Sequence, residues 1–382
     1  MLTESRSRPV RAFQVLLSLL LCSDISGCGI AYLAQATQGQ WRLMRARRHI
    51  DGVLADPSTS PQLKSRLELV QDARDFASSE LQLPDNRSYR SYADLGRPYV
   101  VWNVVAAPEF SIEPLRWCFP FTGCLSYRGY FRERSARVFA DALAARGNDT
   151  LVAGVSAYST LGHFADPVLN TMLRYGDLDL VATIFHELAH QLIYVKGDSE
   201  FNESFAVAVE QEGLRRWLAA RGRSLELQNF LELRRADQQI IRAIASGRAE
   251  LNSLYHEPLS ADRMRERKHE LLAATGENVR ALERQYQIRS GYGAWIDAGL
   301  NNAHLASIAT YSECVPGFQR LLEQHAGQLP AFYAAVRKLG RERSARQALC
   351  RQDAVTAPGT QSAPPAAASL RPSDAATAES RP

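Results

Sequence analysis

Residues 185–190 read FHELAH and lie in a stretch, 180–196, whose apolar residues recur at helical spacing before Gly197. Histidines four apart on a helix point the same way, so His186 and His190 can offer two imidazole nitrogens to one ion. Glu187 follows the first histidine and can take a proton from a water in the open coordination position. The pattern predicts a zinc site on a buried helix. The alternative is a core helix with two hydrogen-bonded histidines, but a chance HExxH in this length is on the order of a one-in-a-hundred event.

A third protein ligand is expected on the next segment, which Ser199 can cap as a second helix running to about residue 220 and back along the first. Glu203 lies about 6 Å into that helix, near the histidines but a little short of them. Glu210 shares its face two turns later, as a supporting partner or as a rival ligand. Glu203 is the preferred ligand and Glu210 stays open.

Several motifs together resemble a family of bacterial envelope proteins known as predicted aminopeptidases. The resemblance rests on FHELAHQLIYVKGDSEFNESFA (185–206), on AYSTLG and ADPVL upstream and on NNAHL downstream, and it spans roughly residues 28–345. That family is similar to the zinc metallopeptidases of the thermolysin-like clan, whose third ligand is a glutamate on the next helix. The resemblance implies zinc at His186, His190 and Glu203, with Glu187 as the base. Many of those enzymes carry an acidic residue four positions after the glutamate ligand, where this chain has Val207, so Glu210 takes that role or the site is tuned differently.

The N-terminus predicts export. Arg6, Arg8 and Arg11 precede an apolar run, 12–22, which is too short to span a bilayer but is typical of a signal peptide. The sequence Ile-Ser-Gly-Cys at 25–28 resembles the lipobox of bacterial lipoproteins, which implies cleavage before Cys28 and acylation of its thiol. Gly29 favours the outer membrane by the same resemblance, so we expect a lipid-anchored envelope protein that faces the periplasm. A plain secretory signal is the alternative.

The composition is that of a globular protein. The chain has 382 residues, of which 46% are hydrophobic and 23% charged, and its net charge is +4. No basic stripe with interleaved aromatic residues is visible, so nucleic acid is not an expected partner. We expect an α+β, zincin-like fold with a small β-sheet, the metal helix and a mainly helical C-terminal half. The expected divisions are a signal peptide (1–27), one domain (28–350, with a helical part 28–95, sheet and metal-site helices 96–222 and a helical part 223–350) and a disordered Ala/Pro/Ser-rich tail (351–382).

The expected secondary structure places further candidates around the metal. The segment 28–83 reads as helical, with a helix start at Ser60 and Pro61. Strands are expected at 99–105 and 150–156, and an irregular stretch or hairpin at 118–131. Further helices are expected at 135–146, 225–244 and 261–286. In the resembling clan, the edge strand before the metal helix pairs with the substrate backbone, and residues 150–160 look like that strand. The substrate-binding candidates at its end are Tyr158, Ser159 and Thr160. An ordinary core strand is the alternative.

Polar residues downstream could complete the chemistry. In the stretch 301–311, His304 or Tyr311 is expected to stabilise the oxyanion, and Asn302 is a substrate-binding candidate. An aminopeptidase would also need a carboxylate near the zinc for the substrate's α-ammonium, for which Glu109 and Glu200 are the candidates.

Cysteine usage agrees with export. Cys118 and Cys124 predict one disulfide, and Cys314 and Cys350 are the other possible pair. Together these features predict a zinc-dependent peptidase with a peptide substrate, as an aminopeptidase rather than an endopeptidase. A metal-binding lipoprotein that only assists envelope assembly is the alternative from another class, but structural zinc would not need the base at Glu187.

Overall fold

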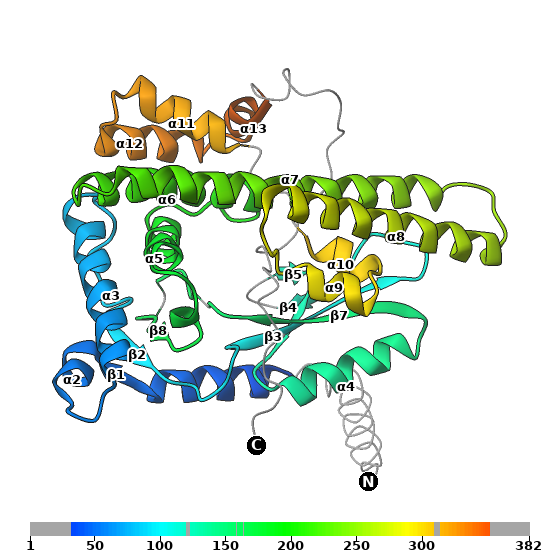
Figure 1. Ribbon diagram of the computed structural model, residues 1–382, viewed down its shortest axis with the longest axis horizontal. Coiled ribbons are helices and arrows are strands. Elements are labelled where there is room, and N and C mark those ends of the chain that lie inside the picture. The colour runs from blue at the N-terminus through cyan, green and yellow to red at the C-terminus, as the bar shows by residue number, and fades with distance from the viewer. Residues whose placement is uncertain (1–31, 120–122, 158, 163, 309–313, 352–382) are drawn as a thin grey trace, which may run out of the picture. The chain divides into compact units, whose positions relative to one another are not determined.

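The computed structural model describes residues 32–119, 123–157, 159–162, 164–308 and 314–351 (Figure 1). The signal peptide, Cys28, Tyr158, Tyr311 and the tail from residue 352 lie outside the described residues. The chain divides into two units after Arg45. In the first unit, residues 32–45 form a helix in which the Arg45 guanidinium lies 4.5 Å from the centre of the Trp41 ring. All that follows concerns the second unit.

The strands of the described residues form small sheets. In one sheet, the central strand β3 (Val101–Pro108) pairs antiparallel with β6 (Arg128–Tyr130) and with β7 (Asn148–Val155), so β7 is an edge strand. β3 is buried over all but its last residue because it has a neighbour on each side and helices packed against it. The remaining strands are β1 (Arg47–His49), β2 (Ser91–Ala93), β8 (Val168–Leu169) and the hairpin of β4 (Trp117–Phe119) and β5 (Gly123–Leu125).

The expected strands at 99–105 and 150–156 are confirmed as β3 and β7, each shifted by about two residues. The helix expected over 28–83 is interrupted, and that part of the prediction was wrong. β1 pairs with β2 from forty residues later, and such long-range pairing overrides local helical propensity. The helix start at Ser60 is confirmed, because its hydroxyl accepts a hydrogen bond from the Leu63 amide and Pro61 opens α3 (Pro61–Ser79). The short helix α2 (Ile50–Ala55) lies between β1 and α3 in the sequence.

The metal-motif helix is α5 (Asp177–Leu192), which packs against α3 and α6 (Ser199–Ala219). Aromatic contacts join the three helices: the Trp217 ring of α6 meets Phe76 of α3 edge-on at 5.2 Å and Phe185 of α5 at 6.2 Å. Gly213 of α6 faces Phe185, and a β-carbon there would come within 2.7 Å of that ring. The glycine therefore lets α6 approach α5 closely.

The sequence predicted that α5 would continue to Lys196, and this was wrong. The helix ends at Leu192, and the chain then turns at Val195, whose backbone N–H and C=O both bond to the Asn202 side chain at 2.8 Å. The cap of α6 is Asp198, whose carboxylate accepts from the Phe201 amide, rather than Ser199. Because the first helix is shorter than expected, the second returns earlier and carries Glu203 closer to the histidines.

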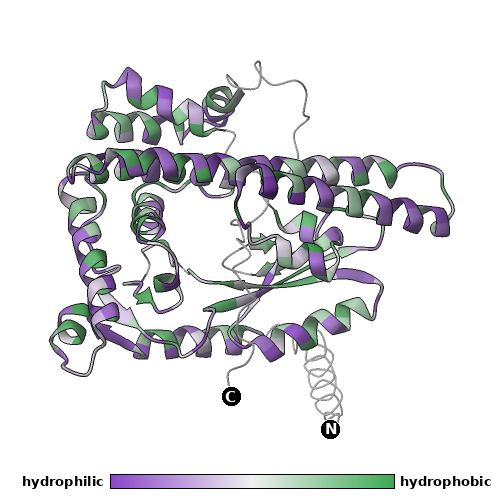
Figure 2. Cartoon of the chain, in the orientation of Figure 1, coloured by the Kyte–Doolittle hydropathy of each residue, from purple (hydrophilic) through white to green (hydrophobic). Residues whose placement is uncertain are grey.

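The C-terminal half is helical, as expected, and Figure 1 shows α7 and α8 lying side by side. Figure 2 shows more hydrophilic residues along α8 than along α5. The predicted helix 261–286 is confirmed at both ends. The predicted helix 225–244 continues ten residues beyond its expected C-terminal end. The helices are α4 (Glu133–Ala144), α7 (Ser224–Leu254), α8 (Ala261–Tyr286), α9 (Gly293–Ala298), α10 (Asn302–Ser307), α11 (Val315–Gln324), α12 (Leu329–Leu339) and α13 (Arg343–Arg351), with one 3-10 turn, η1 (Met172–Arg174). No helix of the described residues is long and apolar enough to cross a membrane.

The described residues contain two disulfides, where the sequence favoured one. Cys118–Cys124 closes the β4–β5 hairpin, and Cys314–Cys350 joins the start of α11 to α13. The sequence left the pairing of Cys314 with Cys350 undecided, because the two cysteines are 36 positions apart.

Replacing Cys314 and Cys350 with alanine is expected to lower the free energy of unfolding by about 4 kcal/mol, because the bridge removes loop entropy from the unfolded chain. The same change at Cys118 and Cys124 should cost about 2 kcal/mol, since the two cysteines are only six positions apart. Denaturant unfolding of both double variants measures the difference. Equal losses would contradict an origin in loop length.

Candidate functional site

His186 and His190 project from the same side of α5 and meet Glu203 from α6. The two histidine Nε2 atoms are 3.1 Å apart. The Glu203 carboxylate places one oxygen 3.3 Å from Nε2 of His186 and the other 3.6 Å from Nε2 of His190. The close approach of α5 and α6 thus brings three donor atoms of metal-ligand type together.

The spacing of these donors fits a metal ion. Ligands about 2.0–2.1 Å from a tetrahedral zinc lie about 3.4 Å from one another. The three separations between donor atoms, 3.1, 3.3 and 3.6 Å, bracket that value. Two imidazoles and one carboxylate are also the donor set of catalytic zinc sites, which leave the fourth position open.

Glu210 lies behind His186 rather than at the meeting point. Its Oε2 is 3.1 Å from the outer nitrogen of His186, Nδ1, and its Oε1 accepts a hydrogen bond of 2.6 Å from Arg234 of α7. A carboxylate on the outer nitrogen fixes the tautomer of a metal-binding histidine and turns Nε2 toward the ion. The geometry therefore places Glu203 where the two histidine Nε2 atoms meet and Glu210 behind His186. The outer nitrogen of His190, by contrast, is buried and has no hydrogen-bond partner among the described residues.

Two carboxylates, Glu203 and Glu210, surround the histidines of the site. Desolvation opposes the charged form of His186, but Glu203 and Glu210 more than offset it and raise the pKa of His186 to about 10. Burial opposes ionisation of both glutamates, yet hydrogen bonds and charges of the histidines hold the pKa of Glu203 low. For Glu210 the charge of Arg234 and the bond to His186 do the same. Such a cluster attracts a cation.

Glu187 stands apart from this network. It is half-buried and directly follows His186 on α5. No hydrogen bond or ion pair joins its carboxylate to another residue of the described ranges. An ionised carboxylate that is not engaged by the scaffold can accept a proton from a water beside the metal-ligand cluster.

Asn302 was expected to contact substrate, and the structure corrects this. Its side chain is fully buried, accepts from the Tyr255 hydroxyl at 2.6 Å, and donates to the backbone carbonyls of Pro108 and Glu109. Glu109, proposed for the substrate amine, instead forms an ion pair of 2.6 Å with Arg265 of α8. Asn302 thus holds α10 against the end of β3 and is not available to a substrate, whereas Glu109 links that end to α8.

The other candidates have these surroundings. Glu200 has an oxygen 3.4 Å from the Cys314 sulfur, at the disulfide. The Ser159 hydroxyl accepts from the Leu161 amide, and the Thr160 hydroxyl and amide both bond to Asp166. His304 closes a capping box with Asn301 at the start of α10, and its ring meets Trp295 edge-on at 5.0 Å. These contacts give His304 a role in the scaffold, and its oxyanion role stays a prediction.

His304 should make stability depend on pH. Burial lowers its pKa to about 4, whereas an unfolded histidine titrates near about 6.5. Below that pH the unfolded chain gains a proton that the folded chain does not, so the free energy of unfolding should fall by on the order of 3 kcal/mol between pH 6.5 and 4. The free energy of unfolding of wild type and of His304→Gln at pH 7 and pH 4.5 gives the part of the pH dependence that comes from His304. The substitution should remove that part. The exposed His256→Gln is the control and should leave the pH dependence unchanged.

The sequence analysis missed Arg234, which reaches the site through its hydrogen bond to Glu210. Arg234 lies in a long charged helix whose pattern gives no sign of a buried partner.

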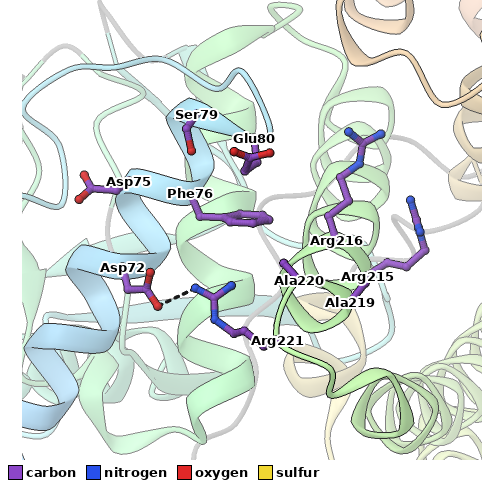
Figure 3. A pocket seen from close by; sticks show the side chains of 10 residues that line it. All are labelled: Asp72, Asp75, Phe76, Ser79, Glu80, Arg215, Arg216, Ala219, Ala220 and Arg221. Carbon is purple, nitrogen blue, oxygen red and sulfur yellow. Dashed lines mark hydrogen bonds and ion pairs between the residues drawn. The ribbon is translucent and has the colours of Figure 1, made fainter.

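A separate pocket of about 570 Å³ lies between α3 and α6 (Figure 3). Its arginines are already paired with acidic residues: Arg221 bonds to Asp72 at 2.6 Å, and Arg215 and Arg216 bond to Glu212 at 2.7 Å. The lining contains none of the metal-ligand residues and no unpaired cation to receive an anionic ligand.

Comparison with known proteins gives one match. No curated protein matches the chain, and no solved structure does either. Residues 31–349 match the model of the family described as "Putative aminopeptidase". That family's description names a peptidase activity, which agrees with the resemblance seen in the motifs. Because the match covers most of the chain and includes all of the metal-ligand cluster, the chain belongs to this family.

Proposed function

We propose that the protein is a zinc-dependent peptidase with a zincin-like catalytic core, acting as an aminopeptidase on peptide substrates. The observation that carries the proposal is the convergence of the two histidine Nε2 atoms, 3.1 Å apart, on the two Glu203 oxygens at 3.3 and 3.6 Å, spacings close to those of ligands around one tetrahedral ion. Family membership supports the peptidase class. The donor helix, the returning glutamate helix and the edge strand β7 support the fold.

Each residue has a role that its contacts support. Zinc bound there would polarise the peptide carbonyl and lower the pKa of a water. Glu187 takes the proton of the attacking water and delivers it to the leaving amine. Glu210, held ionised by Arg234, keeps Nε2 of His186 turned toward the ligand cluster. β7 is an edge strand of its sheet, and we propose that an extended peptide pairs with it.

A peptide library tests the peptidase class. The purified protein should cleave it, lose cleavage after chelation and regain it with one equivalent of zinc. A protein that binds zinc but cleaves no peptide would instead support the non-catalytic envelope factor. Cleavage that survives complete removal of metal would reject the zinc mechanism.

We further propose that the protein is lipid-anchored in the bacterial envelope at Cys28. The lipobox-like run before this cysteine supports the anchor, and the two disulfides fit an oxidising compartment. Mass spectrometry of the N-terminus should find an acylated Cys28, and Cys28→Ala should no longer fractionate with membranes. A free cysteine there, or cleavage at another position, contradicts the anchor.

A further inference from the structure

A second group of side chains with metal-ligand atoms lies at the start of α6, outside the metal-motif cluster. It consists of Glu200 in the first turn of α6, Cys314 at the start of α11 and Cys350 of α13. One ligand atom from each side chain lies within 4.8 Å of the other two. Cys314 is buried, whereas Glu200 and Cys350 are half-buried, so solvent reaches part of the group. Three separate helices therefore bring one carboxylate and two sulfurs together.

The Glu200 carboxylate faces a sulfur that cannot donate a hydrogen bond to it. Its oxygen lies 3.4 Å from the Cys314 sulfur, and that sulfur belongs to the Cys314–Cys350 disulfide. A thiol is a weak donor, but a disulfide sulfur carries no proton. In the oxidised form the sulfur thus offers the carboxylate no compensation for its partial burial, whereas a thiol proton or a bound cation would. This contact suits the reduced form of the pair better than the oxidised one.

The same geometry suits a zinc ion once the two cysteines are reduced. Zinc binds thiolate sulfur at about 2.3 Å and carboxylate oxygen at about 2.0–2.2 Å, so a sulfur and an oxygen that share a tetrahedral ion lie about 3.6 Å apart. The Cys314 sulfur and the Glu200 oxygen are already 3.4 Å apart. Once the bond between the sulfurs is broken, rotation of the side chains lets the sulfurs separate to the spacing of two ligands, about 3.8 Å.

We propose that Cys314, Cys350 and Glu200 form a second metal site, which takes a zinc ion only when the disulfide is reduced. A small dithiol gives two electrons and two protons to the disulfide, so that the S–S bond breaks, two thiols form and the dithiol closes to its own cyclic disulfide. Zinc then replaces the two thiol protons, which leave to solvent, and Glu200 supplies the third ligand. Water takes the fourth position. This site lies beyond the proposed function and does not depend on it.

Charge makes the ion part of the reduced state. Two thiolates beside Glu200 would bring three negative groups together, which is costly away from bulk water. Arg346 lies one turn before Cys350 on α13. Its guanidinium already bonds to Asp198 at 2.6 Å and to the Gly340 carbonyl at 2.8 Å, so its charge is engaged elsewhere. A divalent ion supplies the positive charge instead. Because zinc binds the thiols and not the disulfide, its binding shifts the thiol–disulfide equilibrium toward the thiols.

The test counts zinc in the His190→Ala variant, whose first site has lost a ligand, so that the count reports the second site. The protein is reduced with dithiothreitol, freed of it by desalting without oxygen, loaded with zinc and desalted again. The reduced variant should retain about one zinc per chain, and the oxidised variant, treated in the same way, close to none. Wild type gives the same comparison as about two zinc ions against one, and serves if His190→Ala does not fold.

Further substitutions in the same background identify the ligands. Cys314→Ser combined with Cys350→Ser should bind no zinc after reduction. Glu200→Gln keeps both cysteines and should lose most of the zinc, and it serves if the double serine variant does not fold. The matched control is Cys118→Ser combined with Cys124→Ser, which removes the hairpin disulfide. Reduced in the same way, this control should still retain about one zinc per chain.

A reduced protein that retains no more zinc than the oxidised one overturns the site, as does zinc that persists after Cys314 and Cys350 are replaced. Full retention by Glu200→Gln also overturns it, because two thiols alone would then suffice. Loss of the zinc in the hairpin control would assign it to Cys118 and Cys124 instead. The zinc count requires no peptide cleavage, so a negative result leaves the proposed peptidase standing, and a protein that cleaves no peptide can still bind this zinc.

Discussion

Glu187→Gln should lower kcat for peptide hydrolysis by about 10²–10⁴-fold and leave the zinc content unchanged. Glutamine keeps the shape of the side chain but cannot accept the proton of the attacking water. Because the Glu187 carboxylate bonds to no other described residue, its loss should not disturb the fold or the ligands. Steady-state kinetics with metal analysis of the same preparation measure both quantities.

A matched control is Glu226→Gln, which changes a partly exposed glutamate paired with Arg223 far along the chain from the motif. That variant should keep full activity and metal. If Glu187→Gln lost its metal, the residue would be a ligand; if it kept full activity, another group would be the base.

Glu203→Ala should weaken zinc binding as strongly as His190→Ala, because each removes a ligand outright. Glu203 contacts both histidine Nε2 atoms, at 3.3 and 3.6 Å. Of the nitrogens of the two histidines, Glu210 contacts the outer one of His186. Glu210→Ala should therefore cost only about 10- to 100-fold in zinc affinity, as losses of orienting partners do. Competition titration with a chromophoric chelator gives the three affinities.

Arg234→Gln is the companion variant, because it removes the charge that holds Glu210 ionised without touching a ligand. Its loss of affinity should not exceed that of Glu210→Ala. If Glu210→Ala behaved like His190→Ala and Glu203→Ala did not, the assignment of the two glutamates would be reversed.

The metal-motif helix could be predicted because its signal is local. Helical spacing alone aims His186 and His190 in one direction, and their Nε2 atoms do converge at 3.1 Å. The position of Glu203 relative to the histidines was misjudged, because hydrophobic periodicity does not show where α5 ends. The bonds between Asn202 and the backbone of Val195 end α5 early and bring the next helix forward.

Roles that depend on distant partners could not be predicted from the sequence. Glu109 and Asn302 looked available because the residues that engage them, Arg265 and Tyr255, lie 156 and 47 positions away. Glycine at 213, by contrast, reads as a weak point in a helix, and the close packing of α5 and α6 explains it.

Zinc content is the most direct test of the central claim that His186, His190 and Glu203 form one metal site. Inductively coupled plasma mass spectrometry of the purified, zinc-loaded and desalted protein should find about one zinc per chain in wild type and close to none in His190→Ala. A wild type without zinc, or a His190→Ala variant that retains a full equivalent, would contradict the account.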